Sequence, residues 1–106
     1  MSRVENSFRG SMSLAKAKEL AEKLRGDPAW GGLFALSIVI YDLIEYHRVA
    51  KLEKIYERCL MGRDLVDKML RKLEELGIVE VRGDEVVLTS LGKKVIELAR
   101  WGRVFS

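Results

Sequence analysis

The chain has 106 residues, of which 48% are hydrophobic and 33% charged, and its formal net charge at pH 7 is +3. This length allows one domain with one core, and the apolar content excludes a disordered chain. The mild positive charge permits a nucleic-acid partner without requiring one. The single cysteine, Cys59, excludes an internal disulfide and indicates a reducing compartment, so we expect a cytoplasmic protein.

The first 11 residues lack hydrophobic periodicity and contain Ser, Asn and Gly. They predict a flexible N-terminal segment, followed by a single domain over residues 12–106. A basic arm, in which Arg3 and Arg9 touch phosphates, is the alternative interpretation of this segment. Lys, Arg and Glu dominate the polar positions of the whole chain, and Gln is absent. This bias resembles the composition of thermophile proteins.

Residues 13–25 predict a first helix, with a serine cap at its start and Gly26 at its end. Its narrow apolar seam consists of Leu14, Ala17, Leu20, Ala21 and Leu24. A seam of alanine and leucine lets another helix approach closely. We expect this helix to contact a second copy of the chain, with packing against its own domain as the alternative.

Residues 27–48 predict a central helix, with Asp27 as N-cap and Pro28 at the first helical position. Residues 29–41 carry no charge, but these thirteen residues are too few for a bilayer, which needs about 20. We therefore expect no membrane span. A helix that is apolar almost all round is buried on several sides, and a monomer of this size has little to cover it. The sequence thus predicts a homodimer through the N-terminal and central apolar helices.

Two amphipathic segments follow residues 49–52, which form either a short strand or a turn. Residues 53–61 predict a helix, and its apolar face consists of Leu52, Ile55, Tyr56, Cys59 and Leu60. Gly62 then turns the chain into a second helix over residues 63–76, which ends at Gly77. The apolar seam of that helix consists of Leu65, Val66, Met69, Leu70, Leu73 and Leu76. Two helices joined by a short turn containing Gly form the helix-turn-helix pattern.

A change of period follows Gly77. Residues 78–82 and 85–89 are two short runs rich in β-branched residues, and only Gly83 and Asp84 separate them. This spacing predicts a tight β-hairpin over residues 78–89. Residues 90–101 predict a last helix with Ser90 as its cap. The aromatic residues Trp101 and Phe105 in the tail are expected to cover the core or a partner.

The stretch from Arg63 to Leu91 resembles the second half of a winged helix-turn-helix domain, similar to MarR-type and PadR-type regulators and to small archaeal DNA-binding proteins. The resemblance is carried by the segment Leu73-Glu-Glu-Leu-Gly-Ile-Val79, by the hairpin, and by Leu88-Thr-Ser-Leu-Gly-Lys-Lys94. It implies a mostly α fold with a small β-hairpin wing (α+β), here with additional N- and C-terminal helices. It also implies a dimeric transcriptional regulator that binds double-stranded DNA.

In such proteins the helix that corresponds to residues 63–76 lies in the major groove. The candidate DNA-binding residues are Arg63, Asp64, Asp67, Lys68, Arg71, Lys72 and Arg82. Arg63 is suited to the O6 and N7 atoms of guanine, and aspartate can accept from cytosine N4. Lys68, Arg71 and Lys72 are suited to phosphates. Arg82 lies beside the hairpin turn, from which the resemblance implies a contact with the backbone or the minor groove.

Acidic residues oppose this interpretation. Asp64 and Asp67 repel phosphate, and the wing tip carries Asp84 and Glu85. In the alternative interpretation, Asp64 interacts with the helix dipole, and the pairs Asp64–Lys68 and Asp67–Arg71 are solvated i,i+4 pairs. The alternative function is a winged-helix module that binds a protein within a larger transcription or chromosome complex.

The residues give no indication of catalysis. His47 is the only histidine, and we expect it to interact with carbonyls at a helix C-terminus. Cys59 lies on an apolar helix face and is expected to be an inert core residue. One His and one Cys on different helices do not form a metal site, and no Gly-rich phosphate loop is present. We therefore expect no enzyme activity, no metal and no cofactor, and the sequence identifies no small-molecule effector.

Overall fold

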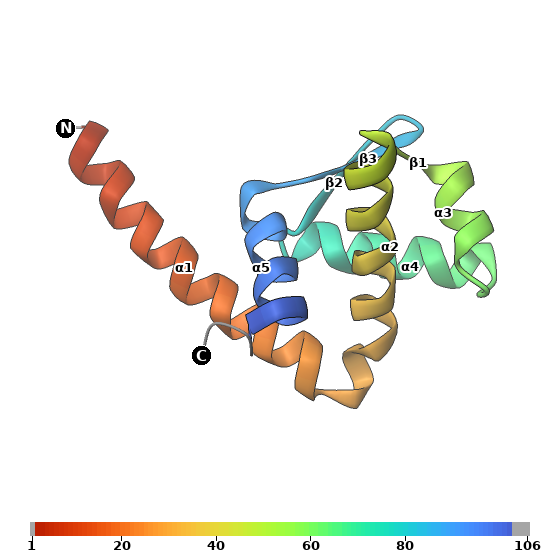
Figure 1. Ribbon diagram of the computed structural model, residues 1–106, viewed down its shortest axis with the longest axis horizontal. Coiled ribbons are helices and arrows are strands. Elements are labelled where there is room, and N and C mark those ends of the chain that lie inside the picture. The colour runs from red at the N-terminus through yellow and green to blue at the C-terminus, as the bar shows by residue number, and fades with distance from the viewer. Residues whose placement is uncertain (1, 103–106) are drawn as a thin grey trace.

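The structure is a computed structural model that describes the backbone of residues 2–102 and the side chains of residues 14–102. It is mostly helical with one small antiparallel sheet, which confirms the predicted α+β class (Figure 1). Its elements in chain order are α1 (Ser2–Gly26), the 3-10 helix η1 (Pro28–Trp30), α2 (Gly31–His47), β1 (Ala50–Lys51), α3 (Leu52–Arg58), α4 (Arg63–Glu75), β2 (Val79–Arg82), β3 (Glu85–Leu88) and α5 (Ser90–Trp101).

Helix α1 begins at Ser2, whereas the sequence predicted a flexible segment over residues 1–11 and a helix from residue 13. Ser and Gly are poor helix formers, but extending an existing helix costs far less than nucleating one. The first half of α1 projects beyond the rest of the molecule (Figure 1). The proposed arm residues Arg3 and Arg9 lie outside the described side chains, as does Phe105.

The second half of α1 packs against α5. Its seam residues Ala17, Leu20, Ala21 and Leu24 are buried, while Leu14 is 40% exposed. Within residues 14–26, therefore, packing on its own domain accounts for most of the seam that we considered for a dimer. At the far end of α5, Trp101 makes an edge-to-face contact with Tyr41, with ring centroids 5.7 Å apart. Trp101 is still 38% exposed, so it covers Tyr41 only in part.

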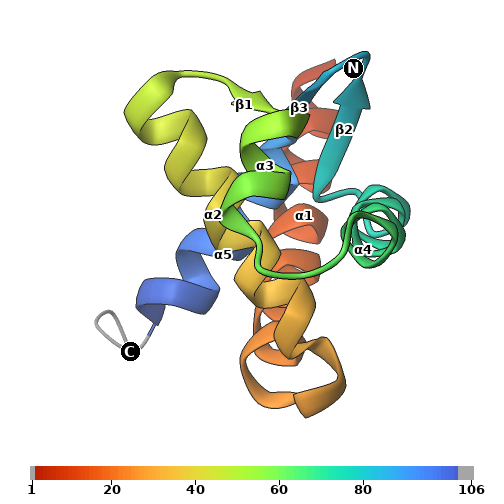
Figure 2. The ribbon, with the colours of Figure 1, turned by 90° about the vertical axis from the view of Figure 1, so that its right-hand side faces the viewer.

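Helix α2 lies at the centre of the fold and contacts every other helix and the sheet (Figure 2). Asp27 caps η1 by accepting a hydrogen bond from the Ala29 amide, at 2.9 Å, and α2 follows directly. The buried residues of α2 are Leu33, Leu36, Ser37, Ile40, Tyr41 and Leu43. The combined helical stretch Pro28–His47 has 20 residues, and an 18-residue window within it has a mean hydropathy of 1.3, so by length and composition it is a candidate membrane span. It is longer than the uncharged run on which we expected no span.

The turn between α3 and α4 differs from the predicted one. Helix α3 ends at Arg58, because Cys59 takes an extended backbone conformation and buries its side chain. Leu60, predicted on the apolar face, is consequently 99% exposed, and the predicted seam residue Leu65 is 49% exposed. Helix α4 begins at Arg63 as predicted and ends at Glu75, with Leu76 as its C-cap.

The three strands form a sheet in the order β1-β3-β2, antiparallel throughout. In the hairpin, Val79 pairs with Leu88 and Arg82 pairs with Glu85, so the turn is the predicted Gly83-Asp84. Gly83 has a φ of +63°, a conformation that costs glycine little. Residues 50 and 51 form the short third strand, so this segment is a strand and not only a turn.

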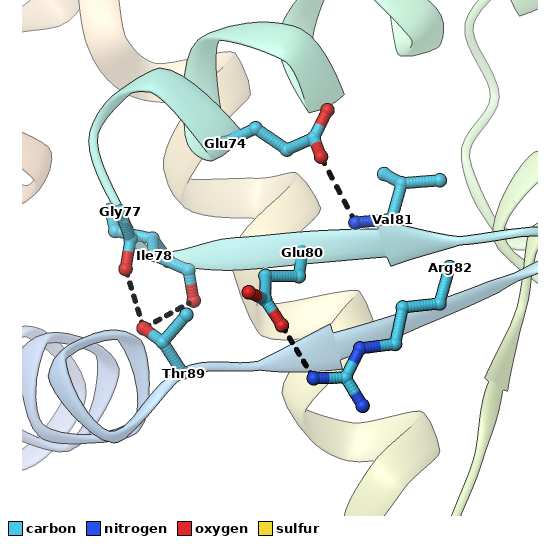
Figure 3. A network of polar contacts seen from close by, with 7 residues as sticks. All are labelled: Glu74, Gly77, Ile78, Glu80, Val81, Arg82 and Thr89. Carbon is cyan, nitrogen blue, oxygen red and sulfur yellow. Dashed lines mark hydrogen bonds and ion pairs between the residues drawn. The ribbon is translucent and has the colours of Figure 1, made fainter.

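Thr89 joins the β2-β3 hairpin to the helices on both sides (Figure 3). Its hydroxyl lies within hydrogen-bond distance of the carbonyl oxygens of Gly77 and Ile78, and it accepts a hydrogen bond from the Gly92 amide at 2.8 Å. Thr89, and not the predicted Ser90, is therefore the N-cap of α5. Gly92 packs on the same junction, because a Cβ placed on it would lie 1.9 Å from the Ile78 carbonyl oxygen.

Gly92→Ala is expected to destabilise the protein by about 3 kcal/mol, at the upper end for an overpacked site, because the new methyl group meets backbone rather than a movable side chain. The control is Gly31→Ala, since Gly31 has a helical φ of −56° and no atom within 4 Å of an added Cβ. That change should alter stability by no more than about 1 kcal/mol. Urea unfolding of the two variants measures both effects, and equal midpoints would contradict the close packing at Gly92.

Candidate nucleic-acid interface

Helix α4 has one buried face and one exposed face. Val66, Leu70 and Leu73 are buried, and α4 packs mainly against α2 and β2. The opposite face carries Asp64, Lys68, Arg71 and Glu75, which recur at helical spacing and are all exposed. The structure thus brings three of the predicted site residues, Asp64, Lys68 and Arg71, onto one solvent-facing surface.

Arg63 lies at the edge of this surface and interacts with α3. Its guanidinium carbon is 4.5 Å from the centroid of the Tyr56 ring, and a guanidinium nitrogen is 4.0 Å from a Glu53 carboxylate oxygen. A guanidinium stacked on an aromatic face keeps its planar donors in a defined orientation. The Arg63 side chain is nevertheless 67% exposed, so it remains accessible to a ligand.

Asp67 is also held by Tyr56, whose hydroxyl donates a hydrogen bond to the Asp67 carboxylate. This hydrogen bond is the main cause that raises the pKa of Tyr56, with burial adding to it. Neither expected pair, Asp64–Lys68 or Asp67–Arg71, has a charged contact within 4.0 Å in the described part of the chain. Sequence reasoning missed Tyr56, because its spacing on α3 marked it only as an apolar-face residue.

Lys68 and Arg71 have no acidic partner in direct contact. Among residues 14–102, no carboxylate lies within 4.0 Å of the charged nitrogens of either side chain. Lys72 also lacks such a partner within that range, and its ammonium nitrogen is 6.0 Å from the centroid of the Trp30 ring. Helix α4 therefore carries three basic groups that no described acidic side chain neutralises by direct contact.

Carboxylates of the hairpin, by contrast, neutralise two basic residues of the sheet. Arg82 forms an ion pair with Glu80 at 2.7 Å (Figure 3). Lys51 on β1 lies 3.3 Å from Asp84 and 3.2 Å from Glu85, and hydrogen bonds to these two carboxylates raise its pKa. These groups are 40% or more exposed, so each pair contributes little to stability, but the pairs reduce the positive charge on this side of the molecule.

The described residues show no arrangement suited to metal-dependent chemistry. Within residues 14–102, no group of three or more His, Cys, Asp or Glu side chains is placed to hold a metal ion. His47 is exposed at the end of α2, and no hydrogen bond of its ring is seen in that range. Cys59 is 6% exposed, and burial raises the pKa of its thiol.

An open cleft of about 350 Å³ lies between the end of α2, strand β3 and the start of α5. Its walls include Tyr41, Ile44, Arg48, Leu88 and Lys93. The cleft combines apolar and charged groups, but no described side chain in it marks a particular ligand.

No family model matches the chain, and comparisons with curated proteins and with solved structures found no match either.

At pH 8 the Cys59 thiol of the native protein is expected to react with a disulfide reagent at least about tenfold more slowly than in urea, because it is buried and its pKa is raised. Absorbance of the released thiol measures both rates on the same sample. Similar rates in the two conditions would show that Cys59 is accessible and would overturn its assignment as a core residue.

Proposed function

We propose that the chain is a winged helix-turn-helix protein of the cytoplasm that acts as a dimeric DNA-binding transcriptional regulator. Support for the fold comes from the element order α2-β1-α3-α4-β2-β3 and from the sheet order β1-β3-β2. Helices α3 and α4 are joined by residues 59–62 alone and correspond to the helix-turn-helix pair. Strands β2 and β3 are the wing, while α1 and α5 are the additional helices.

One observation carries the proposal that the ligand is DNA. The solvent-facing surface of α4, opposite its buried seam, presents Lys68 and Arg71 without a described carboxylate in contact. In a helix-turn-helix protein this surface enters the major groove. Free ammonium and guanidinium groups release counterions when they meet phosphates, and that release supplies much of the affinity for DNA.

The remaining candidate residues then take distinct roles. Arg63, oriented by the Tyr56 ring, reads guanine through paired donors. In this proposal Asp64 and Asp67 accept hydrogen bonds from cytosine N4, and Asp67 shares its carboxylate with Tyr56. Lys72 contacts phosphate. Arg82 contacts the DNA backbone only when its ion pair with Glu80 is broken.

Lys68→Ala and Arg71→Ala are each expected to weaken binding to duplex DNA and to reduce the steepness of its salt dependence. For one lost phosphate contact, the slope of log K against log salt should fall by about 0.9. Fluorescence anisotropy over a salt series measures both quantities. The control is Lys94→Ala, which removes one positive charge from an exposed position on α5. If all three variants behave like the wild type, α4 is not the DNA-contacting helix.

The dimer proposal is supported by the outer face of α2. Ala35 and Tyr46 are exposed on this central helix, and Ile38 and Val39 are only partly covered. Tyr46 is 80% exposed. Ala35, Ile38 and Val39 form one small apolar patch, and the half-buried Asp42 separates this patch from Tyr46 along the helix. An apolar patch of this kind is typical of an interaction surface, and in a symmetric dimer the same patch faces itself.

Ala35→Glu is expected to convert the dimer to a monomer, because a carboxylate in an apolar interface loses its hydration without a partner. Sedimentation equilibrium at matched concentrations gives the mass directly. Lys94→Glu, which places the same residue on α5, should leave the dimer intact. A wild-type protein that is monomeric at all concentrations would remove the dimer from the proposal.

The second candidate function is a winged-helix module that binds a protein. Leu60 and Leu65 favour it, because they expose apolar surface beside the start of α4 at 99% and 49%. Purification of the protein from its native cells distinguishes the two functions. A stoichiometric protein partner without enrichment of DNA favours the module, and enrichment of defined DNA segments favours the regulator.

A further inference from the structure

A tryptophan with two lysines beside it joins α4 to the end of α1. The Lys23 ammonium nitrogen is 5.0 Å from the centroid of the Trp30 ring, and that of Lys72 is 6.0 Å from it. The two ammonium nitrogens are therefore no more than 11 Å apart, the sum of those distances. The lysines come from the end of α1 and the second half of α4, and Trp30 comes from η1 between them.

The arrangement gathers positive charge without neutralising it. In the described part of the chain, no carboxylate lies within 4.0 Å of the ammonium group of Lys23 or Lys72. The acidic residue nearest to Trp30 in the sequence is Asp27. Its carboxylate caps η1 by accepting a hydrogen bond from the Ala29 amide. A cation–π contact at an exposed site is weak, and two like charges near one ring repel each other.

This cluster lies on the flank of α4 that faces away from the wing. Lys72 and Glu74 are two residues apart, which places them on nearly opposite sides of a helix. Glu74 accepts a hydrogen bond from the Val81 amide of β2, at 3.1 Å (Figure 3), so its side marks the wing. Lys68 precedes Lys72 by one turn, and the three lysines therefore form a row that leads from the exposed face of α4 towards α1.

We propose that Lys23, with Lys72 and the Trp30 ring between them, forms a phosphate-contact site of the DNA backbone that extends the interface from α4 onto α1. This inference rests on the proposed DNA-binding function and deepens it. The wing offers little positive charge, since Arg82 and Lys51 are paired with carboxylates of the hairpin. The flank with Lys23 supplies backbone contacts on the other side of α4 instead. Both ammonium groups lie within 6.0 Å of the Trp30 ring centroid, so one phosphate group bound near the ring is within reach of both.

The test uses Trp30 as a reporter. The chain has two tryptophans, so Trp101→Phe leaves Trp30 alone while it keeps an aromatic ring beside Tyr41. In this background, addition of duplex DNA is expected to change the Trp30 emission. Lys23→Ala should reduce the salt slope of binding by about 0.9, so that a rise from about 50 to 200 mM salt costs the variant about 3.5-fold less affinity than the parent.

Two further variants separate a phosphate contact from a structural effect. Lys23→Arg keeps the charge and the stacking on Trp30, and should retain the parent slope. Lys94→Ala removes a charge from α5 and should also retain it. A parent protein that binds duplex DNA with a slope unchanged by Lys23→Ala would overturn this inference and leave the proposed function standing. A parent protein that binds no duplex at low salt would overturn both.

Discussion

The hydroxyl of Thr89 ties three elements together at one point. It contacts the carbonyl oxygens of Gly77 and Ile78, where α4 ends and the hairpin begins. It also accepts a hydrogen bond from the amide of Gly92, where α5 begins. Gly77, with a φ of +79°, lets the chain leave α4 at the angle this junction requires. The Gly92 backbone then lies against Ile78 so closely that no side chain fits. The position of the hairpin relative to α4 depends on this junction, and so does the shape of the surface that α4 presents.

The charges on that surface divide according to the neighbours that the fold gives them. Side chains near α3 and the hairpin have partners: Arg63 and Asp67 share Tyr56, and Arg82 is paired with Glu80. Lys68 and Arg71, on the face of α4 opposite α2, have no described carboxylate in contact. A net charge of +3 therefore understates the local asymmetry. Affinity for a polyanion depends on the basic groups that can reach its phosphates, rather than on the net charge of the whole protein.

Much of the fold was predictable from local signals. The bounds of α4, the two-residue hairpin turn and the extent of α5 follow from hydrophobic periodicity, from Gly77 and from Gly83-Asp84, all of which act within a few residues. The start of α1 and the exposure of Leu60 were not predictable in this way. Leu60 points outward because Cys59, its neighbour, is drawn into the core formed by other helices. A single sequence shows the spacing of apolar residues but not which neighbour the core can accommodate.

The candidate site was predictable in its residue types and not in its pairings. Periodicity identified α4 and its basic residues, but the expected i,i+4 pairs are not in contact in the described residues. Tyr56 is eleven residues from Asp67, and Lys23 and Lys72 meet at Trp30 only after α1, η1 and α4 have packed together. Contacts of this kind depend on tertiary structure, since the side chains lie far apart in the sequence.

The central claim is that the exposed face of α4 binds DNA and reads its sequence. Selection of the purified protein against a random duplex library, at about 50 mM and about 200 mM salt, tests it most directly. The account predicts that duplexes are retained at the lower concentration, that retention falls steeply at the higher one, and that a short sequence motif is enriched in both selections. Failure to retain duplexes at low salt, or retention of duplexes without any enriched motif, would contradict it.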